Sequence, residues 1–300
     1  MGPRNKGRNM SHRIVEATWL APQVKRFVVE APHVVKRCGP GQFVIVRVTV
    51  NGERIPLTIG RADKQAGTVM LVVQAIGATT HKMCALATGD TLADVAGPLG
   101  RPTDIAHVGH AVIVGGGVGT AVIFPQAAAL KAKGNYVSAI TGGRSRPYVI
   151  LEQELRAICD EVHPCTDDGS HGFHGFVTRR LEQLITESAG TNPVKLVLCA
   201  GPVPMMRAVA EVTRARGIHT VASLNPIMVD GTGMCGGCRV QVGGRMLFAC
   251  VDGPEFDAHQ VDFGELADRL TAYKSWERAA MERQEQDVCH ATGRVEEEDR

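Results

Sequence analysis

Short apolar, β-branched runs separated by turn residues dominate the first hundred residues. One such run covers residues 42–50 and another covers residues 67–74. Turn-forming residues interrupt the chain at 39–41, 51–52 and 97–100. Runs of this length and composition are typical of β-strands. Short strands joined by such turns predict a small antiparallel barrel.

The pattern changes near His107 to an alternation of strands and helices. The apolar run 111–114 stops at Gly115, and a helical run over 118–133 follows. We then expect a strand over 136–140, helices over 151–159 and 178–188, a strand over 194–199 and a helix over 204–216. This alternation indicates a doubly wound parallel sheet of the α/β class. The barrel therefore comes first along the chain and the α/β unit second.

A third pattern follows Ala222. Residues 226–263 are rich in glycine and cysteine, with short strands expected at 239–242 and 245–248. So short a segment can scarcely bury enough apolar surface to fold alone, and a bound metal centre would account for its order. The residues after Leu266 continue in a helical pattern and then become charged.

These patterns divide the chain into five parts. We expect a disordered extension over 1–11, a barrel over 12–105, an α/β domain over 106–224, a small metal-binding domain over 225–264, and a C-terminal helix with a disordered tail over 265–300. The helix carries Tyr273 and Trp276, and the tail becomes disordered after about Gln284. Because only 4% of the residues are aromatic, we expect these two to pack on another subunit or on the small metal-binding domain rather than to be left in water. Packing within the chain alone is the alternative.

Composition and charge exclude several classes of protein. A formal net charge of +2 does not suggest a nucleic-acid partner. The chain has no apolar run of about 18 residues, so we expect no membrane span. Its first twelve residues are basic and polar and lack the apolar core of a secretory signal, which makes a cytoplasmic protein the default expectation. Nine cysteines at irregular spacing do not resemble a secreted disulfide framework.

Three of these cysteines lie together in the glycine-rich segment. Cys235 and Cys238 are separated by two glycines, and Cys250 follows after eleven more residues. Iron–sulfur clusters need soft anionic ligands on a backbone that can approach closely, and this spacing lets one loop offer two thiolates. The segment holds no fourth cysteine, and the position where one would be expected holds Asp230, the candidate for the fourth ligand. A turn residue before Gly231, with another thiol or water completing the site, is the alternative interpretation of Asp230. The motif predicts a 2Fe–2S cluster.

A zinc ribbon is the alternative interpretation of this segment. Zinc usually takes two Cys-x2-Cys pairs or a histidine. The segment has one such pair, and no histidine lies between Ser223 and Ala258. The pattern therefore favours the cluster over zinc.

The barrel contains two candidate phosphate or ring contacts. Arg54, Pro56, Leu57 and Thr58 combine a cation with a hydroxyl, which could hold a phosphate and the edge of a flat ring. A β-turn with an exposed arginine is the alternative.

The second contact of the barrel precedes a short helical run over 81–86. The candidate residues there are Val73, Gln74, Gly77, Thr79 and Thr80. A glycine and two threonines at a helix N-terminus are suited to a pyrophosphate. An ordinary helix cap is the alternative.

The α/β unit carries a glycine-rich turn in the context of a dinucleotide site. It follows an apolar strand and opens a helix, and its residues are Gly115, Gly116, Gly117, Gly119 and Thr120. The third glycine of the usual fingerprint is replaced by Thr120, and a tight turn without a nucleotide is the alternative. Gly201 and Pro202 follow the last predicted strand, at the edge where such folds place ligands.

The next two turns of this unit carry charge. Gly142 and Arg144 offer an arginine near a ribose or phosphate. Asp167 and Asp168 form an acidic turn, which beside an adenosine ribose would accept hydroxyl hydrogen bonds and repel a 2′-phosphate. That favours NAD over NADP, and a simple capping turn is the alternative.

With these motifs in this order, the chain resembles the ferredoxin–NADP reductase superfamily. Within it, the chain looks like the branch of the dihydroorotate dehydrogenase electron-transfer subunits and the small subunits of NADH-dependent ferredoxin:NADP oxidoreductase, also called sulfide dehydrogenase. The resemblance covers roughly residues 12–275. It is most specific at residues 54–58, 166–170, 201–206, 228–238 and 248–256.

The resemblance implies a set of cofactors and partners. The cofactors are FAD, NAD(H) and a 2Fe–2S cluster. NADH would pass a hydride to FAD, and electrons would then leave singly through the cluster, with no catalytic side chain required. The implied partner is a larger flavin and iron–sulfur subunit that binds NADP and is similar to glutamate synthase. Together the two subunits could bifurcate electrons between NADP and ferredoxin. A dihydroorotate dehydrogenase partnership and a non-catalytic zinc module are the competing hypotheses.

Three departures from the family pattern matter. The dihydroorotate branch has a cysteine where this chain has Asp230, and the ferredoxin:NADP oxidoreductase branch has the aspartate. The flavin arginine usually precedes the proline directly, whereas Ile55 intervenes after Arg54. The superfamily often has a cysteine before the Gly-Pro pair. Here that position holds Ala200 and Cys199 is one place early, so we assign Cys199 no catalytic role.

Overall fold

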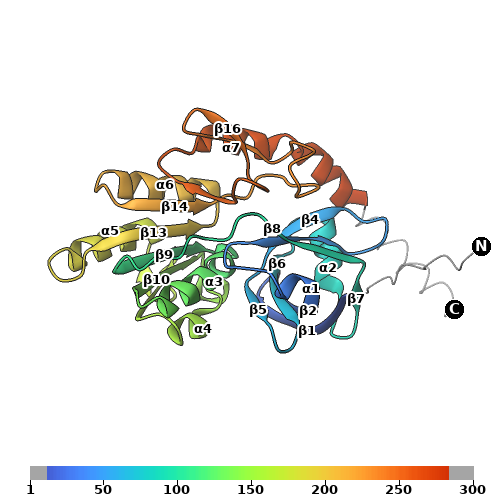
Figure 1. Ribbon diagram of the computed structural model, residues 1–300, viewed down its shortest axis with the longest axis horizontal. Coiled ribbons are helices and arrows are strands. Elements are labelled where there is room, and N and C mark those ends of the chain that lie inside the picture. The colour runs from blue at the N-terminus through green and yellow to red at the C-terminus, as the bar shows by residue number, and fades with distance from the viewer. Residues whose placement is uncertain (1–11, 284–300) are drawn as a thin grey trace, which may run out of the picture.

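The first part of the chain folds as two antiparallel sheets that face each other, and the predicted barrel is confirmed (Figure 1). The structure, a computed structural model, describes residues 12–283, so the disorder expected at 1–11 and after Gln284 lies outside the described residues. The larger sheet has the order β5 (Arg61–Asp63), β6 (Thr68–Gln74), β2 (Val24–Glu30), β1 (His12–Ala21) and β7 (Thr91–Leu92). The smaller sheet has the order β4 (Arg54–Thr58), β3 (Phe43–Arg47) and β8 (Asp94–Leu99). Two short helices join strands, α1 (Pro32–Val35) and α2 (Ala78–Ala85).

Strand β3 is apolar on both faces because both faces are covered. Val44 and Val46 point into the barrel core, where they join Phe27 of β2. Phe43 and Ile45 point the opposite way into a second core that also contains residues of the cysteine-rich segment. Successive side chains of a strand alternate between faces, so a continuous apolar run is the pattern expected of a strand between two cores.

The α/β unit is doubly wound, as predicted. Its sheet has the order β12 (Phe173–His174), β11 (Glu161–Thr166), β10 (Tyr136–Gly143), β9 (His110–Gly116), β13 (Val194–Ala200), β14 (His219–Ser223) and β17 (Glu255–Asp257). All neighbours are parallel except β17, which pairs antiparallel with β14. One face packs in a core with α3 (Gly119–Ala132) and α4 (Glu152–Arg156), the other in a core with α5 (Val177–Ser188) and α6 (Val203–Arg214). A 3-10 turn, η1 (Arg146–Tyr148), precedes α4.

The cysteine-rich segment is built onto the other two units. Its hairpin of β15 (Arg239–Val242) and β16 (Arg245–Phe248) matches the predicted strands. The following strand β17 extends the α/β sheet, and α7 (Phe263–Thr271) begins at Asp262, whose carboxylate accepts from the N–H groups of Gly264 and Glu265. Cys238, Val240 and Cys250 are buried in the same core as residues of β3 and α6. The segment forms a layer over the junction of the other two units (Figure 1).

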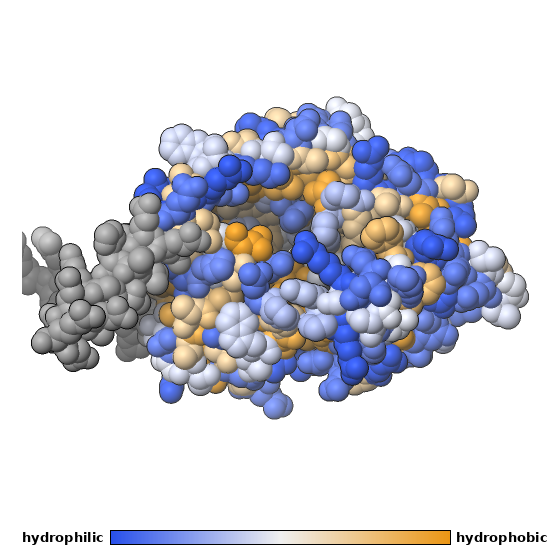
Figure 2. Space-filling view, turned by 180° about the vertical axis from the view of Figure 1, so that it is seen from behind, coloured by the Kyte–Doolittle hydropathy of each residue, from blue (hydrophilic) through white to orange (hydrophobic). Residues whose placement is uncertain are grey.

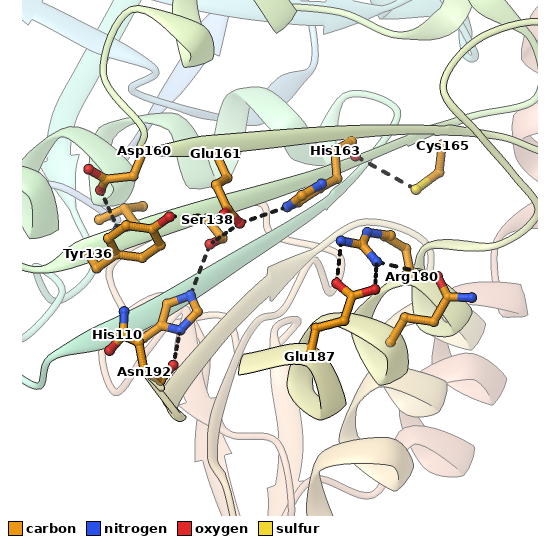
Figure 3. A network of polar contacts seen from close by, with 12 residues as sticks. His110, Tyr136, Ser138, Asp160, Glu161, His163, Cys165, Arg180, Glu187 and Asn192 are labelled. Carbon is orange, nitrogen blue, oxygen red and sulfur yellow. Dashed lines mark hydrogen bonds and ion pairs between the residues drawn. The ribbon is translucent and has the colours of Figure 1, made fainter. Parts of the chain in front are cut away.

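Polar residues link the amino ends of the parallel strands β9, β10 and β11 (Figure 3). Nε2 of His110 lies 2.9 Å from Oγ of Ser138, which donates to Glu161 at 3.3 Å. Such an arrangement resembles a catalytic relay. However, Ser138 is 0% exposed and His110 is 2% exposed, so no substrate can reach the hydroxyl. We interpret the network as a structural link between neighbouring strands at that end of the sheet.

None of the helices within residues 12–283 combines the length and the apolar character that a membrane crossing requires.

Glu255 lies where the three units meet. Its Oε1 accepts hydrogen bonds from Oγ1 of Thr103, in the segment after β8, at 3.0 Å and from Nε2 of Gln126 of α3 at 2.7 Å. Burial raises the pKa of Glu255, and the two hydrogen bonds offset part of that effect. In the part of the chain that the structure describes, Glu255 forms no ion pair. Burial outweighs the two hydrogen bonds, so the neutral carboxyl is favoured in the folded chain more than in the unfolded chain.

We expect Glu255 to make stability depend on pH. A pKa that is higher in the folded chain than in the unfolded chain gives stability that is lost as pH rises through the folded value. Glu255→Gln should therefore raise the melting temperature at pH 8 more than at pH 5. Thermal unfolding across that range, with the surface variant Glu182→Gln as control, measures the effect. Parallel melting curves for wild type and Glu255→Gln at all pH values would contradict this account.

Candidate functional site

A cavity of about 1130 Å³ lies between the barrel and the α/β unit, with residues of the cysteine-rich segment in its wall. Figure 2 shows a hollow on this face, beneath the upper layer of the molecule and with apolar side chains along its rim. The cavity is lined by residues at or just beyond the carboxyl ends of β9, β10, β13 and β14. That edge, where the strand order reverses around β9, is where doubly wound sheets bind ligands.

Most of the residues predicted to bind a cofactor line this one cavity. They are Pro56, Leu57, Thr58, Val73, Gln74, Thr80, Gly116, Gly117, Gly119, Gly142, Arg144, Asp167, Gly201 and Pro202. The predicted residues that do not line it are Arg54, Gly77, Thr79, Gly115, Thr120 and Asp168. The structure thus brings two separate sets of motifs, one from the barrel and one from the α/β unit, to the same space.

Strand β4 supplies the barrel wall of the cavity. Pro56, Leu57 and Thr58 lie at its carboxyl end and line the cavity, while Arg54 is exposed at its beginning. Alternation along the strand places Arg54 on the same face as Pro56 and Thr58. The side chain of Arg54 therefore starts two residues along the strand from Pro56, which lines the cavity.

The N-terminus of α2 faces the cavity through Thr80. Oγ1 of Thr80 accepts from the N–H groups of Ile76 and Gly77, at 3.1 and 2.9 Å, and donates to the carbonyl of Gly77 at 2.9 Å. These bonds fix the turn so that the first N–H groups of the helix remain available, and nothing lies within 4 Å of where a Cβ of Gly77 would be. The hydroxyl of Thr79 instead donates to the carboxylate of Glu53, outside the cavity. An open helix N-terminus of this kind fits a pyrophosphate.

The opposite end of α2 is held by a buried lysine that sequence reasoning missed. Nζ of Lys25 donates to the carbonyls of Cys84 and Leu86 at 2.9 and 2.7 Å. A cation at a helix C-terminus complements the helix dipole. The only signal in the sequence was a lysine within an apolar strand.

The glycine-rich turn after β9 is shaped by close contacts. Gly117 has a φ of +55°, and nothing lies within 4 Å of a Cβ at this position, so it leaves room for a ligand beside the backbone. A Cβ at Gly119 would lie 2.1 Å from the carbonyl oxygen of Ala200, so only glycine lets α3 approach the end of β13. Thr120, at the place of the third fingerprint glycine, is buried and does not line the cavity.

The two aspartates of the acidic turn have different roles. Asp167 lines the cavity together with Arg144. Asp168 does not; its Oδ1 accepts from the N–H and the hydroxyl of Ser170, and these bonds lower the pKa of Asp168. The capping interpretation therefore describes Asp168. Arg144 and Asp167 have opposite effects on a 2′-phosphate, since one attracts it and the other repels it.

Several lining residues were not expected from the sequence. Phe176 is 66% exposed at the rim, directly before α5, and Met205 lies between the turns at Gly116 and Gly201. Residues 223–226 also line the cavity, at the end of β14. That strand was not predicted, so its carboxyl end could not be recognised as part of the site.

Cys199 is fully buried, and burial raises the pKa of its thiol to about 12. A thiol of this kind is protonated and inaccessible at neutral pH. It is Ala200, the next residue, that lines the cavity. The assignment of no catalytic role to Cys199 agrees with this geometry.

Two of the three clustered cysteines are already adjacent. Sγ of Cys238 and Sγ of Cys250 lie 3.2 Å apart, and both residues are 1% exposed. Cys235 is exposed in the glycine loop, where its sulfur accepts from the N–H of Gly237 at 3.5 Å. Burial and the neighbouring Cys238 thiol raise the pKa of Cys250 to about 12. Such a pair becomes anionic when a metal supplies the opposing positive charge.

This donor set fits a two-iron cluster better than a single ion. Within residues 12–283, no three His, Cys, Asp or Glu side chains lie close enough to hold one metal ion. A tetrahedral zinc site needs four ligands around one point. A 2Fe–2S cluster divides its ligands between two irons, so a buried pair and a more exposed pair suit it.

Asp230 holds the loop that carries Cys235. Its Oδ1 accepts from the N–H of Thr232 and its Oδ2 from the N–H of Cys235, both at 2.9 Å. The Thr232 bond is the main reason why the pKa of Asp230 lies below its ordinary value. The carboxylate is thus a turn residue, and it also stands next to the proposed ligands. Both interpretations made from the sequence remain consistent with this position.

Comparisons with known protein families find matches to the barrel and to the cysteine-rich segment. Residues 11–103 match the family described as an oxidoreductase FAD-binding domain. Residues 225–262 match the iron–sulfur cluster binding domain of dihydroorotate dehydrogenase B.

Full-length relatives extend this agreement. The chain is 43% identical over 274 residues to a homologue of the electron transfer subunit of dihydroorotate dehydrogenase B (NAD(+)) from Thermotoga maritima, covering 91% of this chain and 95% of that protein. It is 35% identical over 231 residues to the corresponding subunit from Bacillus caldolyticus, covering 74% of this chain and 86% of that protein. A solved structure of an NADH-dependent reduced ferredoxin-NADP oxidoreductase, described in the context of flavin-based electron bifurcation, is 41% identical with a TM-score of 0.85. That match covers 92% of this chain and 99% of the other.

We expect Thr80→Val to weaken FAD binding about five- to tenfold. The change removes the acceptor of two backbone N–H groups and loosens the turn before α2, a loss of about 1 kcal/mol. Titration of the flavin-free chain with FAD measures the affinity. Thr80→Ser keeps the hydroxyl and should bind as wild type does, and Thr79→Val should also have little effect. Equal weakening by Thr79→Val would show that the cavity-facing hydroxyl is not the one that matters.

Proposed function

The chain belongs to the family of dihydroorotate dehydrogenase B electron transfer subunits, and on this premise we propose that it oxidises NADH through FAD and delivers electrons singly to a 2Fe–2S cluster. It is an oxidoreductase subunit with an FAD-binding domain and an iron–sulfur domain. One observation carries the proposal. A single cavity opens onto the barrel motif, the glycine turn of the α/β unit and the cysteine-rich segment.

The chain's own residues divide the task between them. FAD supplies the conversion of a two-electron donor into single electrons. Thr58, Gln74 and the N-terminus of α2 would hold it on the barrel side. The turn at Gly116–Gly119 and the end of β13 would hold the nicotinamide nucleotide on the facing side. Facing walls of one cavity bring the two reactants together, and orientation is the protein's main contribution.

Both ends of the cluster segment reach this cavity. Met228, two residues before Asp230, lines it, and so does Pro254, four residues after Cys250. The loop at Gly231 also packs on Leu99 and Ile45 of the small barrel sheet. A short stretch of packed chain therefore separates the flavin position from the cysteine pair, as one-electron transfer requires.

For the partner, we propose a larger flavin and iron–sulfur subunit that binds NADP and is similar to glutamate synthase, with bifurcation toward ferredoxin. Asp230 supports this choice over a dihydroorotate dehydrogenase partner, whose electron-transfer branch has a cysteine at that position. Free cysteines along the described chain suit a reducing compartment, in support of a cytoplasmic location.

The sequence predicts that Tyr273 and Trp276 pack on a partner subunit or on the cysteine-rich domain, and within the chain they are not buried. They are 55% and 71% exposed, because the chain after α7 leaves the core of the cysteine-rich segment. Met234, beside Cys235, is 88% exposed. We propose that the partner subunit covers the aromatic pair, since exposed aromatic residues commonly anchor interfaces.

Affinity purification of the tagged chain from its native cells tests the function and the partner together. We expect a flavin-containing large subunit to be captured, and NADH to bleach the flavin absorbance of the complex. The double variant Tyr273→Ala, Trp276→Ala should reduce capture at least tenfold while leaving NADH-dependent bleaching of the isolated chain intact. Recovery of a dihydroorotate dehydrogenase would support the alternative, and a colourless protein would refute the function.

We expect Asp167→Ser to shift nucleotide preference toward NADPH by about tenfold. The variant removes the carboxylate that repels a 2′-phosphate and leaves Arg144 to attract it. Stopped-flow reduction of the flavin by NADH and by NADPH measures the ratio. Asp168→Ser is the matched control, because that carboxylate caps a turn outside the cavity and should not change the ratio. A shift of equal size in the control would refute the assignment.

We expect Asp230 to be the fourth ligand of the cluster. A carboxylate donates less electron density to iron than a thiolate does, so the oxidised state is less stabilised and the potential is higher. Asp230→Cys should keep the cluster and lower its potential, and Asp230→Ala should leave it labile. EPR-monitored redox titration decides the matter, with Asp252→Ala as a nearby non-ligand control. An Asp230→Ala protein with wild-type spectrum, potential and cluster content would exclude Asp230 as a ligand.

A further inference from the structure

Two arginines from different elements meet at the loop between Cys235 and Cys238. Nη2 of Arg269, on α7, donates to the carbonyl oxygen of Gly237 at 3.1 Å. Nη1 of Arg239, at the start of β15, lies 3.0 Å from the position that a Cβ of Gly236 would occupy. The two glycines that separate the cysteines are thus each in contact with one guanidinium group.

Both arginines are only partly exposed, so water screens them less than a surface charge. The Arg269 side chain is 29% exposed, and its nearest carboxylate is Glu265, 4.0 Å away between Nη1 and Oε1. Within residues 12–283, Arg239 forms no ion pair at all. Asp230 also faces the cysteine loop, where its carboxylate accepts from the N–H of Cys235. The positive charge of Arg239 beside the loop is therefore not held in an ion pair with any carboxylate of residues 12–283.

A guanidinium group stays protonated at all accessible pH values, so its charge is constant. Reduction of a 2Fe–2S cluster adds one electron, taken from the reduced flavin, and converts one ferric ion to ferrous without a proton. The cluster and its ligands then become more negative by one unit. A fixed cation close by lowers the free energy of that more negative state, as charge and hydrogen bonding around a cluster generally set its potential.

We propose that Arg239 and Arg269 are positioning residues that raise the potential of the cluster and hold the loop of Cys235 in place. This inference rests on the proposed function, because it requires that the cysteines carry the cluster. It concerns residues outside the ligand set, and it assigns them a role in favouring the arrival of the electron. Arg269 acts through both a hydrogen bond and its charge, whereas Arg239 acts through charge.

Substitutions can separate charge from hydrogen bonding. Arg269→Gln removes the charge but keeps an N–H donor that can reach toward Gly237, and Arg269→Lys keeps the charge but loses the planar fork. Arg239→Gln removes the charge beside Gly236. Arg245→Gln is the matched control. It removes the same charge from the same hairpin, but Arg245 pairs with Val242 at the far end, three residue pairs from Arg239, which is about 10 Å along the strand.

EPR-monitored redox titration of the purified, cofactor-loaded chain tests the proposal, because EPR detects only molecules that hold the cluster. In Arg239→Gln and Arg269→Gln we expect the ratio of reduced to oxidised cluster at a fixed potential to fall about tenfold, equivalent to a negative shift of about 59 mV for a one-electron couple. Arg269→Lys should stay within threefold of wild type, and Arg245→Gln should not change.

The outcomes distinguish this inference from the function on which it rests. A wild-type chain with no 2Fe–2S signal refutes the proposed function and the inference together. A wild-type signal with unchanged potentials in both glutamine variants refutes only the inference. A shift of the same size in Arg245→Gln also refutes it, since the effect would then be one of overall charge rather than of position.

Discussion

The arrangement depends on one constraint, which is that the cysteine-rich segment cannot bury enough apolar surface to fold alone. The segment is instead stabilised by hydrophobic cores that it shares with the barrel and the α/β unit. Phe43 and Ile45 of β3 form one side of the core that contains Cys238 and Cys250, and β17 joins the α/β sheet through β14. The barrel and the α/β unit are thereby joined through a third unit as well as through their direct contact. The packing of the cysteine-rich segment on both units therefore helps to fix the position of the cavity between them.

The same constraint explains why cofactor positions far apart in the sequence lie close in space. Because the segment is anchored at its ends, Met228 and Pro254 form part of the cavity wall, and the cysteines lie behind that wall. Apolar packing places Cys238 and Cys250, whereas the glycine loop and Asp230 place Cys235. The buried pair is thus fixed by the hydrophobic core and the third cysteine by hydrogen bonds.

Sequence reasoning recovered the elements whose patterns are local. The apolar run ending at Gly115 and the hairpin of residues 239–248 were predicted because strand length, glycine and alternation are visible in a short window. Strands β14 and β17 were missed, since β14 owes its place to parallel pairing with β13 and the three-residue β17 owes its place to antiparallel pairing with β14. The surface that Trp276 packs on was left open, because composition does not tell whether an aromatic residue faces its own chain or another, and within this chain it is exposed.

The candidate site shows the same division in finer detail. Motifs gave the residue types, but only the fold separates Asp167, which lines the cavity, from Asp168, which caps a turn one residue later. Likewise Thr80 and Thr79 are equivalent in the sequence, and the direction of the helix sends one hydroxyl to the turn and the other to Glu53. A one-residue step along a turn or helix changes the direction of a side chain completely. A motif therefore locates a site to within a few residues, and the backbone geometry selects the atoms that act there.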